Sequence, residues 1–332
     1  MSAPAHAAAV HTVDLDSDGW PLEATARGPR PVPADRLLDH FAEELAPPDW
    51  ATDLLVYVHG WQTRPDSALS AVQRLLALAT SQHERRRALY PELTPWRPWT
   101  VLVRWPSRSL PSLGGYRRIR DRAHAMSTDG HAARVIGRLL GYLDAHRADP
   151  AASGVLANRD GQYLHLVGHS FGCRFLCEAV QWAADAPGAT LGWSTPAPPG
   201  RPFTVDSMLL LQMAAPRDAF TATFTALAAA PLRGPVVATY SQHDRATGFW
   251  HLRAEKRAGI GYAGIGTAPA PVSAITMRGV EEPYPHDVLD HRFVSVDASE
   301  VYVRGSGPAG AHSDHLRPES AHLLLSLADH SR

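Results

Sequence analysis

The chain has 332 residues, of which 45% are hydrophobic, and its formal net charge at pH 7 is −1. This composition permits a large buried core, and the small net charge gives no long-range field that would favour nucleic acid. Two cysteines are too few for a disulfide scaffold, and nowhere do 18 apolar residues run together as a membrane span requires. Since the first residues also lack the pattern of a secretory signal, we expect a cytoplasmic protein with no nucleic-acid partner and no membrane span.

The first fifty residues are rich in proline and aspartate and contain one amphipathic helical pattern, at residues 34–45. We expect residues 1–50 to form a peripheral segment and residues 51–332 to form a single domain. The domain opens with DLLVYVHGW at residues 53–61, a continuous apolar run that ends in His-Gly. Such a run is typical of a strand that is buried on both faces.

Strand and helix patterns alternate along the rest of the chain, which predicts parallel strands joined by right-handed crossovers. We therefore expect an α/β fold with a mostly parallel central sheet flanked by helices. Further strand patterns lie at residues 99–105 and 163–168 and begin at residues 207, 235 and 292; helical patterns lie at residues 68–82, 131–146, 173–184 and 318–330. Three stretches have little regular pattern and are expected to form long loops or a small cap: residues 107–125, 187–204 and 245–291.

The sequence GHSFG at residues 168–172 has the form G-x-S-x-G. In a chain of this length the pattern arises by chance with odds near ~0.1 at ordinary glycine and serine frequencies, so the pattern alone is weak. Here, however, it joins the end of an apolar strand to the start of a helix. That is the context of a nucleophile elbow, in which the two glycines let neighbouring backbones approach closely. The sequence therefore predicts that Ser170 is a nucleophile.

A serine hydroxyl needs a base to take its proton, and the base needs an acid to orient it. In elbow enzymes the chain order is serine, then acid, then histidine. Asp244 follows the strand that begins at residue 235 and is the favoured acid, whereas Asp218 follows the preceding strand and is the alternative. After the last strand, His312 is the favoured base because the preceding Gly-Pro-Ala-Gly run could carry it to Ser170, and His315 is the alternative.

The negative charge of a tetrahedral intermediate also needs hydrogen-bond donors. We expect the backbone amides of Phe171, at the start of the helix, and Trp61, after the His-Gly turn, to form this oxyanion hole. The stretch from Arg117 to Arg122 could hold a substrate carboxylate or phosphate, although a solvated arginine face is the simpler interpretation. No zinc-binding spacing and no phosphate-binding loop is present, so no metal or cofactor is expected.

The segments VYVHGW, WPS, LVGHSFG, SQHD and HSD occur in this order, and together they resemble the α/β-hydrolase superfamily. They are similar to a bacterial branch of its serine hydrolases. The resemblance covers the chain from about residue 54 to the last helix, and it implies the same assignment of Ser170 as nucleophile, Asp244 as acid and His312 as base. The long stretch between Asp244 and residue 292 departs from the pattern.

These observations favour a serine hydrolase that cleaves a small-molecule carboxylic ester or thioester through an acyl-enzyme and a Ser-His-Asp triad. The alternative is a non-catalytic protein of the same fold that binds a ligand or a partner, because a fold does not fix a function.

Overall fold

The computed structural model describes residues 10–93, 95–147, 162–185, 205–228, 230, 232–305 and 307–332. Its centre is an eight-stranded sheet in which every neighbouring pair of strands is parallel. In spatial order the strands are β1 (Val10–Asp14), β5 (Pro98–Arg104), β4 (Asp53–Val58), β6 (Tyr163–His169), β7 (Ser207–Leu211), β8 (Val236–Tyr240), β10 (Phe293–Asp297) and β9 (Val272–Thr276). The α/β class and the parallel sheet predicted from the sequence are confirmed.

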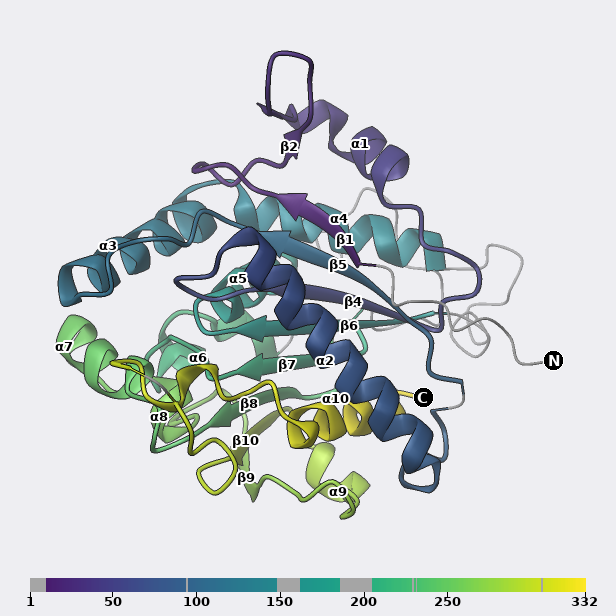
Figure 1. Ribbon diagram of the computed structural model, residues 1–332, viewed down its shortest axis with the longest axis vertical. Helices are drawn as coiled ribbons and strands as arrows, with labels where there is room; N and C mark the ends of the chain where they lie inside the picture. The colour runs from purple at the N-terminus through teal and green to yellow at the C-terminus, as the bar shows by residue number, and fades with distance from the viewer. Residues whose placement is uncertain are drawn as a thin grey trace.

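Helices cover both faces of the sheet (Figure 1). The longer ones are α1 (Leu37–Glu44), α2 (Pro65–Arg85), α3 (Leu113–His124), α4 (Ala132–Arg147), α5 (Gly172–Asp185) and α10 (Pro318–His330). Helices α2 and α10 pack together on one face, and α1, α4 and α5 pack on the other. Side chains of β4 alternate between the two layers, since Leu54 and Val56 join one core cluster and Leu55 and Tyr57 join the other.

Residues 10–50 are not the peripheral segment that we expected for residues 1–50. Strand β1 pairs with β5 along its whole length at the edge of the sheet, and Val13, Val32 and Phe41 are buried in the same core cluster as β4. The domain therefore does not begin at residue 51. Strand β1 has no continuous apolar run because it is an edge strand with partly exposed residues, which is why its sequence did not stand out.

Two of the three stretches expected to be irregular contain regular structure. Residues 107–125 include helix α3, and residues 245–291 include η5 (Ala246–Trp250), α7 (His251–Glu255), α8 (Ile260–Ala263), β9 and α9 (His286–Leu289). The third stretch, residues 187–204, lies outside the described residues. Helices α3, α7 and α8 gather beyond the carboxyl ends of the strands (Figure 1), and this edge is where an α/β sheet binds its ligands.

The remaining short elements complete the chain. They are β2 (Leu22–Glu23) and β3 (Arg30–Pro31), which pair antiparallel, α6 (Ala219–Ala222), and the short helices η1 (Ala34–Arg36), η2 (Arg87–Leu89), η3 (Ala125–Asp129), η4 (Thr225–Ala228) and η6 (Ala311–Ser313).

Candidate active site

Ser170 lies in a tight turn between β6 and α5. Its φ is 55°, in the left-handed region that residues other than glycine rarely adopt. The end of β7 and the residues after it hold the turn, because the Ser170 amide donates to the Leu211 carbonyl at 3.0 Å and the Ala214 amide donates to the Ser170 carbonyl at 3.2 Å. This strained strand-to-helix turn is the backbone geometry of a nucleophile elbow.

The glycines on either side of Ser170 are required by close packing. A Cβ atom on Gly172 would lie 2.1 Å from the carbonyl oxygen of Val58 in β4, and a Cβ atom on Gly168 would lie 2.8 Å from Cα of Cys173. Neither position can therefore hold a larger residue without a shift of backbone. The close approach expected between β6 and α5 occurs at Gly168, whereas Gly172 allows α5 to meet the neighbouring strand β4.

His312, in η6, lies between Ser170 and Asp244. The Ser170 hydroxyl donates to His312 Nε2 at 2.7 Å, and His312 Nδ1 donates to the Asp244 carboxylate at 2.8 Å. These roles follow from chemistry, because an ionised carboxylate can only accept and the proton of the neutral imidazole must therefore be on Nδ1. Ser170 is 1% exposed and His312 is 6% exposed. The three residues predicted from the sequence thus form one shielded chain of hydrogen bonds.

The Asp244 carboxylate is fully buried, and both of its oxygens are occupied. Oδ1 accepts from the Thr247 amide at 3.0 Å, and Oδ2 accepts from the side-chain amide of Gln212 at 3.1 Å as well as from His312. Three donors fix the plane of the carboxylate and compensate it for the loss of water. Gln212 and Thr247 were not singled out in the sequence, where a polar residue after a strand carries no specific signal.

The loop that carries Asp244 and the loop that carries His312 are also joined through their backbones. The Ala311 amide donates to the His243 carbonyl at 2.9 Å, and the Arg245 amide donates to the Ala309 carbonyl at 3.0 Å. These bonds form an antiparallel bridge on both sides of Asp244. The acid and the base are therefore held in register by the main chain, independently of their side chains.

The two alternative residues lie elsewhere. The Asp218 side chain is 40% exposed and forms an ion pair with Arg257 at the surface, without contact to His312. His315 is buried and stacks on His169, with ring centroids 3.9 Å apart, and it makes no hydrogen bond to Ser170. The geometry therefore favours Asp244 over Asp218 and His312 over His315.

The amides expected to form an oxyanion hole flank Ser170. Phe171 follows it directly, and the turn before Trp61 touches it, because a Cβ atom on Gly60 would lie 2.7 Å from Cβ of Ser170. Within the described residues, neither the Trp61 amide nor the Phe171 amide has a hydrogen-bond partner. Both amides are thus available to an acceptor outside the chain.

His59 braces the turn that carries Trp61. Its Nδ1 donates to the Gly60 carbonyl at 2.9 Å, and its Nε2 accepts from the Trp105 amide at 3.2 Å. Burial lowers the pKa of His59 to about 4, so the imidazole stays neutral near pH 7 and keeps both bonds. These two hydrogen bonds indicate that His59 stabilises the turn that carries Trp61.

Helix α3 packs over this part of the site. The Tyr116 ring lies 5.3 Å from the Phe171 ring and 5.4 Å from the Trp61 ring, measured between centroids. Burial raises the pKa of Tyr116 well above its usual value, so its hydroxyl stays protonated. The stretch from Arg117 to Arg122, which the sequence left open, belongs to this helix and is mainly engaged within the protein.

The arginines of α3 contact two neighbouring segments. Arg120 forms an ion pair with Glu255 at 3.4 Å and donates to the Ala254 carbonyl at 3.2 Å, and both partners belong to α7. Arg122 donates to the Pro106 carbonyl at 2.7 Å. These contacts join α3 to α7 and to the segment after β5.

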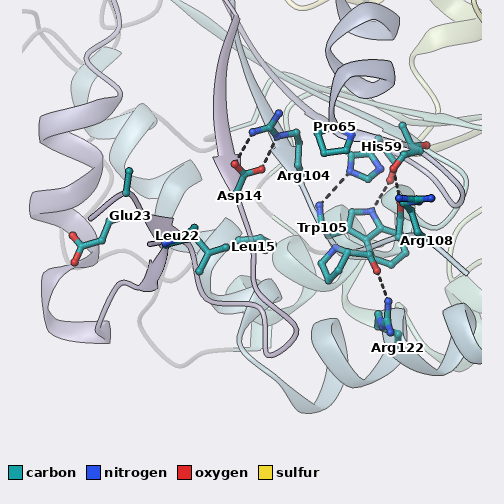
Figure 2. Close-up of a pocket in the computed structure, with 15 residues that line it drawn as sticks. Asp14, Leu15, Leu22, Glu23, His59, Pro65, Arg104, Trp105, Arg108 and Arg122 are labelled. Atoms are coloured by element: carbon teal, nitrogen blue, oxygen red, sulfur yellow. Dashed lines mark hydrogen bonds and ion pairs between the residues drawn. The ribbon is translucent and has the colours of Figure 1, made fainter. Parts of the chain in front are cut away.

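A cleft of about 560 Å³ opens at the carboxyl ends of β1 and β5 (Figure 2). Trp105 lies beside His59 in its wall, Arg104 pairs with Asp14, and Arg122 reaches a backbone carbonyl. Ser170 and His312 are not among the residues that line this cleft. One of its lining residues, His59, contacts the turn that carries Trp61.

Burial keeps two further histidines beside the triad neutral. It lowers the pKa of His169 well below its usual value and the pKa of His315 to about 3. His169 Nε2 donates to the His312 carbonyl at 2.9 Å. His169 therefore supports the loop that carries His312.

A second set of serine, histidine and aspartate lies in contact at the other end of the strands, where the strands begin. The Ser207 hydroxyl donates to His165 Nδ1 at 2.8 Å, and His165 Nε2 donates to Asp53 at 3.0 Å. Arg332 also donates to Asp53, at 2.8 Å. All three side chains of the set are buried at the amino ends of β4, β6 and β7, where no strained turn presents the serine. We interpret this set as a buried polar network.

Within the described ranges, no group of three or more histidine, cysteine, aspartate or glutamate side chains is placed to hold a metal ion. No helix in the same ranges combines the length and the apolar character needed to cross a bilayer.

No family model matches the chain, and no curated protein sequence matches it. Among solved structures, one similar chain is TT1662 from Thermus thermophilus, which is 16% identical. The match covers 86% of this chain and 90% of that chain, with a TM-score of 0.36. At this sequence identity and TM-score, the similarity gives no information about activity. The chain itself has an α/β fold with a parallel sheet and helices on both faces.

Proposed function

We propose that this protein is a serine hydrolase of the α/β-hydrolase fold that cleaves a carboxylic ester or thioester through an acyl-enzyme. The observation that carries the proposal is the chain of hydrogen bonds from Ser170 through His312 to Asp244, built on a serine with φ of 55°. A serine in such a turn, with a neutral histidine as acceptor, is the arrangement that activates a hydroxyl for acyl transfer.

In the first half of the reaction, Ser170 Oγ attacks the carbonyl carbon while His312 Nε2 takes the hydroxyl proton. The carbonyl oxygen becomes an oxyanion, which the free amides of Trp61 and Phe171 stabilise. Asp244 stabilises the imidazolium that forms. The bond to the leaving group then breaks, His312 delivers the proton to the departing alcohol or thiol, and the acyl group remains on Ser170.

In the second half, a water molecule attacks the acyl-enzyme and gives its proton to His312. The tetrahedral intermediate collapses, His312 returns the proton to Ser170 Oγ, and the carboxylic acid leaves. The atoms and protons balance without a cofactor. The requirement on the protein is that one neutral imidazole accepts and returns a proton twice in each cycle.

Hydrolysis of p-nitrophenyl esters of graded acyl length by the Ser170→Ala variant tests the proposal. We expect wild-type turnover to be lost, because the nucleophile is removed while little packing changes. The matched control is Ser207→Ala, which removes the serine of the buried network and should leave turnover in place. If the wild type hydrolyses none of these esters, or if Ser170→Ala retains full turnover, the protein is instead a non-catalytic member of this fold or uses another nucleophile.

A further inference from the structure

The end of β7 and the residues that follow it contact two members of the candidate triad and the residue that precedes the third. The Leu211 carbonyl accepts from the Ser170 amide, and the Ala214 amide donates to the Ser170 carbonyl. Between them, the Gln212 side-chain amide donates to Asp244 Oδ2 at 3.1 Å and to the Ala311 carbonyl at 3.0 Å. Ala311 directly precedes His312. The nucleophile, the acid and the loop of the base thus meet at this single segment.

The orientation of the Gln212 amide is fixed by its partners. Both groups that face its nitrogen, the carboxylate of Asp244 and the carbonyl of Ala311, can only accept. The reverse orientation would place the amide oxygen against two acceptors and is excluded. The Gln212 oxygen is buried and has no hydrogen-bond partner within the described residues. A buried oxygen without a hydrogen-bond donor is unfavourable. The two hydrogen bonds that the Gln212 nitrogen donates are therefore the interactions that favour a glutamine here.

The backbone of Gln212 is also held in an unfavourable conformation. Its φ is 48°, and its amide donates to the Thr239 hydroxyl at 3.2 Å. Gly261 packs against it so closely that a Cβ atom there would lie 2.6 Å from the Gln212 carbonyl carbon. A residue without a side chain would adopt this φ at lower cost. The strain is explained if the side chain itself is needed at this point.

We propose that Gln212 is a positioning residue of the hydrolase, which orients the Asp244 carboxylate and ties the His312 loop to it. The proposal rests on the proposed function. The side-chain amide of Gln212 fixes Oδ2 of Asp244, the same oxygen that His312 Nδ1 contacts. Loss of this donor frees the carboxylate to rotate and weakens the alignment of the imidazole. Gln212 acts on the reaction only through these two residues and has no proton to transfer.

Three titratable groups buried around this cluster stay uncharged near pH 7. Burial holds His169 and His315 neutral, with the pKa of His315 at about 3, and the pKa of Tyr116 lies well above its usual value. None of these three groups therefore contributes to a shift in the pH profile of a Gln212 variant.

Two substitutions at Gln212 separate positioning from packing, and both keep the side-chain length and a Cβ atom at the strained φ. Gln212→Met removes both donors. We expect kcat to fall about 10- to 100-fold, the range found when an outer partner of a functional group is removed, with KM for a small ester little changed. Gln212→Glu places a second carboxyl group against Asp244, and the two groups share one proton because two buried carboxylates in contact do not both ionise. The second ionisation occurs only as the pH rises, so the midpoint of the kcat/KM profile should be displaced from that of the wild type by at least half a unit.

The matched control is Gln82, another buried glutamine whose side-chain nitrogen makes two hydrogen bonds, to Tyr90 Oη at 3.1 Å and to the Val280 carbonyl at 2.6 Å. It lies in α2, away from the triad. Gln82→Met and Gln82→Glu should lower the melting temperature without moving the pH profile. If Gln212→Met retains wild-type kcat, or if Gln212→Glu lowers activity equally at every pH, the positioning role is wrong. If the wild type itself shows no ester turnover and no reaction with a fluorophosphonate, the proposed function fails instead. Should Gln212→Met not fold, the profile of Gln212→Glu decides alone.

Discussion

Within the described part of the chain, two hydrogen-bonded sets of serine, histidine and aspartate lie at opposite ends of the strands, and the backbone conformation at the serine distinguishes them. Ser170 has a left-handed φ and follows the carboxyl end of β6, whereas Ser207 is the first residue of β7. Asp53 in the second set is also tied to Arg332. Burial alone would raise the pKa of Asp53, but the hydrogen bond from His165 and the charge of Arg332 hold it below its usual value. At the residue scale, therefore, backbone conformation and position on the sheet identify the candidate nucleophile.

The first prediction concerns the base. His312→Ala should lower kcat by about 10³-fold or more, because it removes the only acceptor of the Ser170 proton, and adding Ser170→Ala should cost nothing further since triad members act as a unit. His315→Ala should stay within about tenfold of the wild type, because His315 packs on His169. Steady-state ester hydrolysis measures both. A larger loss for His315→Ala than for His312→Ala would reverse the assignment.

The second prediction concerns the acid. Asp244→Asn should lower kcat by about 10⁴-fold, as the loss of an orienting carboxylate does in another triad, because the asparagine no longer fixes the tautomer of His312. Asp218→Asn should have little effect, because that carboxylate pairs with Arg257 at the surface. The same assay compares the two variants. Equal losses would remove the distinction that the geometry draws between them.

At the scale of elements, the elbow is held by contacts between backbones. Gly172 allows α5 to touch the carboxyl end of β4, and the segment after β7 holds Ser170 from the other side. These contacts join three neighbouring strands at the point where the nucleophile sits. The sequence could predict the elbow, because the strand, the motif and the helix are contiguous. It could not predict that β4 and β7 supply the supporting contacts, which join residues more than forty positions apart.

The third prediction tests this packing. Gly172→Ala should lower the free energy of unfolding by about 1–3 kcal/mol or more, because the new Cβ atom would meet the Val58 carbonyl and the core has no room to yield. The control is Gly114→Ala in α3, where the added Cβ has only one neighbour, at 3.9 Å. That change should be neutral or stabilising by up to about 1 kcal/mol, since alanine favours a helix. Urea denaturation distinguishes the two; an unchanged Gly172→Ala midpoint would contradict the close contact.

One physical reason explains why several elements could not be predicted from the sequence. Strand β1 lies at an edge of the sheet and β9 lies at the other, so neither is buried on both faces and neither has a long apolar run. Helix α3 buries only a narrow face, including Tyr116 and Ile119, and its other side carries the arginines. Apolar periodicity therefore predicted the buried strands and their helices, and it failed where one face is polar. Gln212 was missed because only tertiary contacts give it a role.

At the scale of the whole molecule, many histidines are buried in their neutral form. Burial lowers the pKa of His59 to about 4 and of His315 to about 3, and it also lowers the pKa of the others in the same direction: His83, His169, His251, His322 and His330. In the unfolded chain these side chains bind a proton near pH 6.5. The unfolded state therefore takes up more protons than the folded state as the pH falls below that value.

The fourth prediction follows from this difference. The contribution of the neutral histidines to stability should be complete above about pH 7.5 and should be lost as the pH drops through 6.5 toward the lowered folded-state values. His59 and His315 together should contribute about 3 kcal/mol of loss between pH 7.5 and 5.5, and His315→Gln should reduce the loss by about 1.4 kcal/mol. Urea denaturation at the two pH values measures the difference. A free energy of unfolding that is unchanged between them would contradict the burial of neutral histidines.

The central claim is that Ser170 is a covalent nucleophile activated by His312. Reaction with a fluorophosphonate, followed by mass spectrometry of the digested protein, tests it most directly, because the reagent labels a serine only when a base activates it. We expect one phosphonyl adduct per chain, on Ser170, and no adduct in the Ser170→Ala and His312→Ala variants, while Ser207→Ala is labelled like the wild type. An unlabelled wild type, or an adduct on any other residue, would contradict the claim.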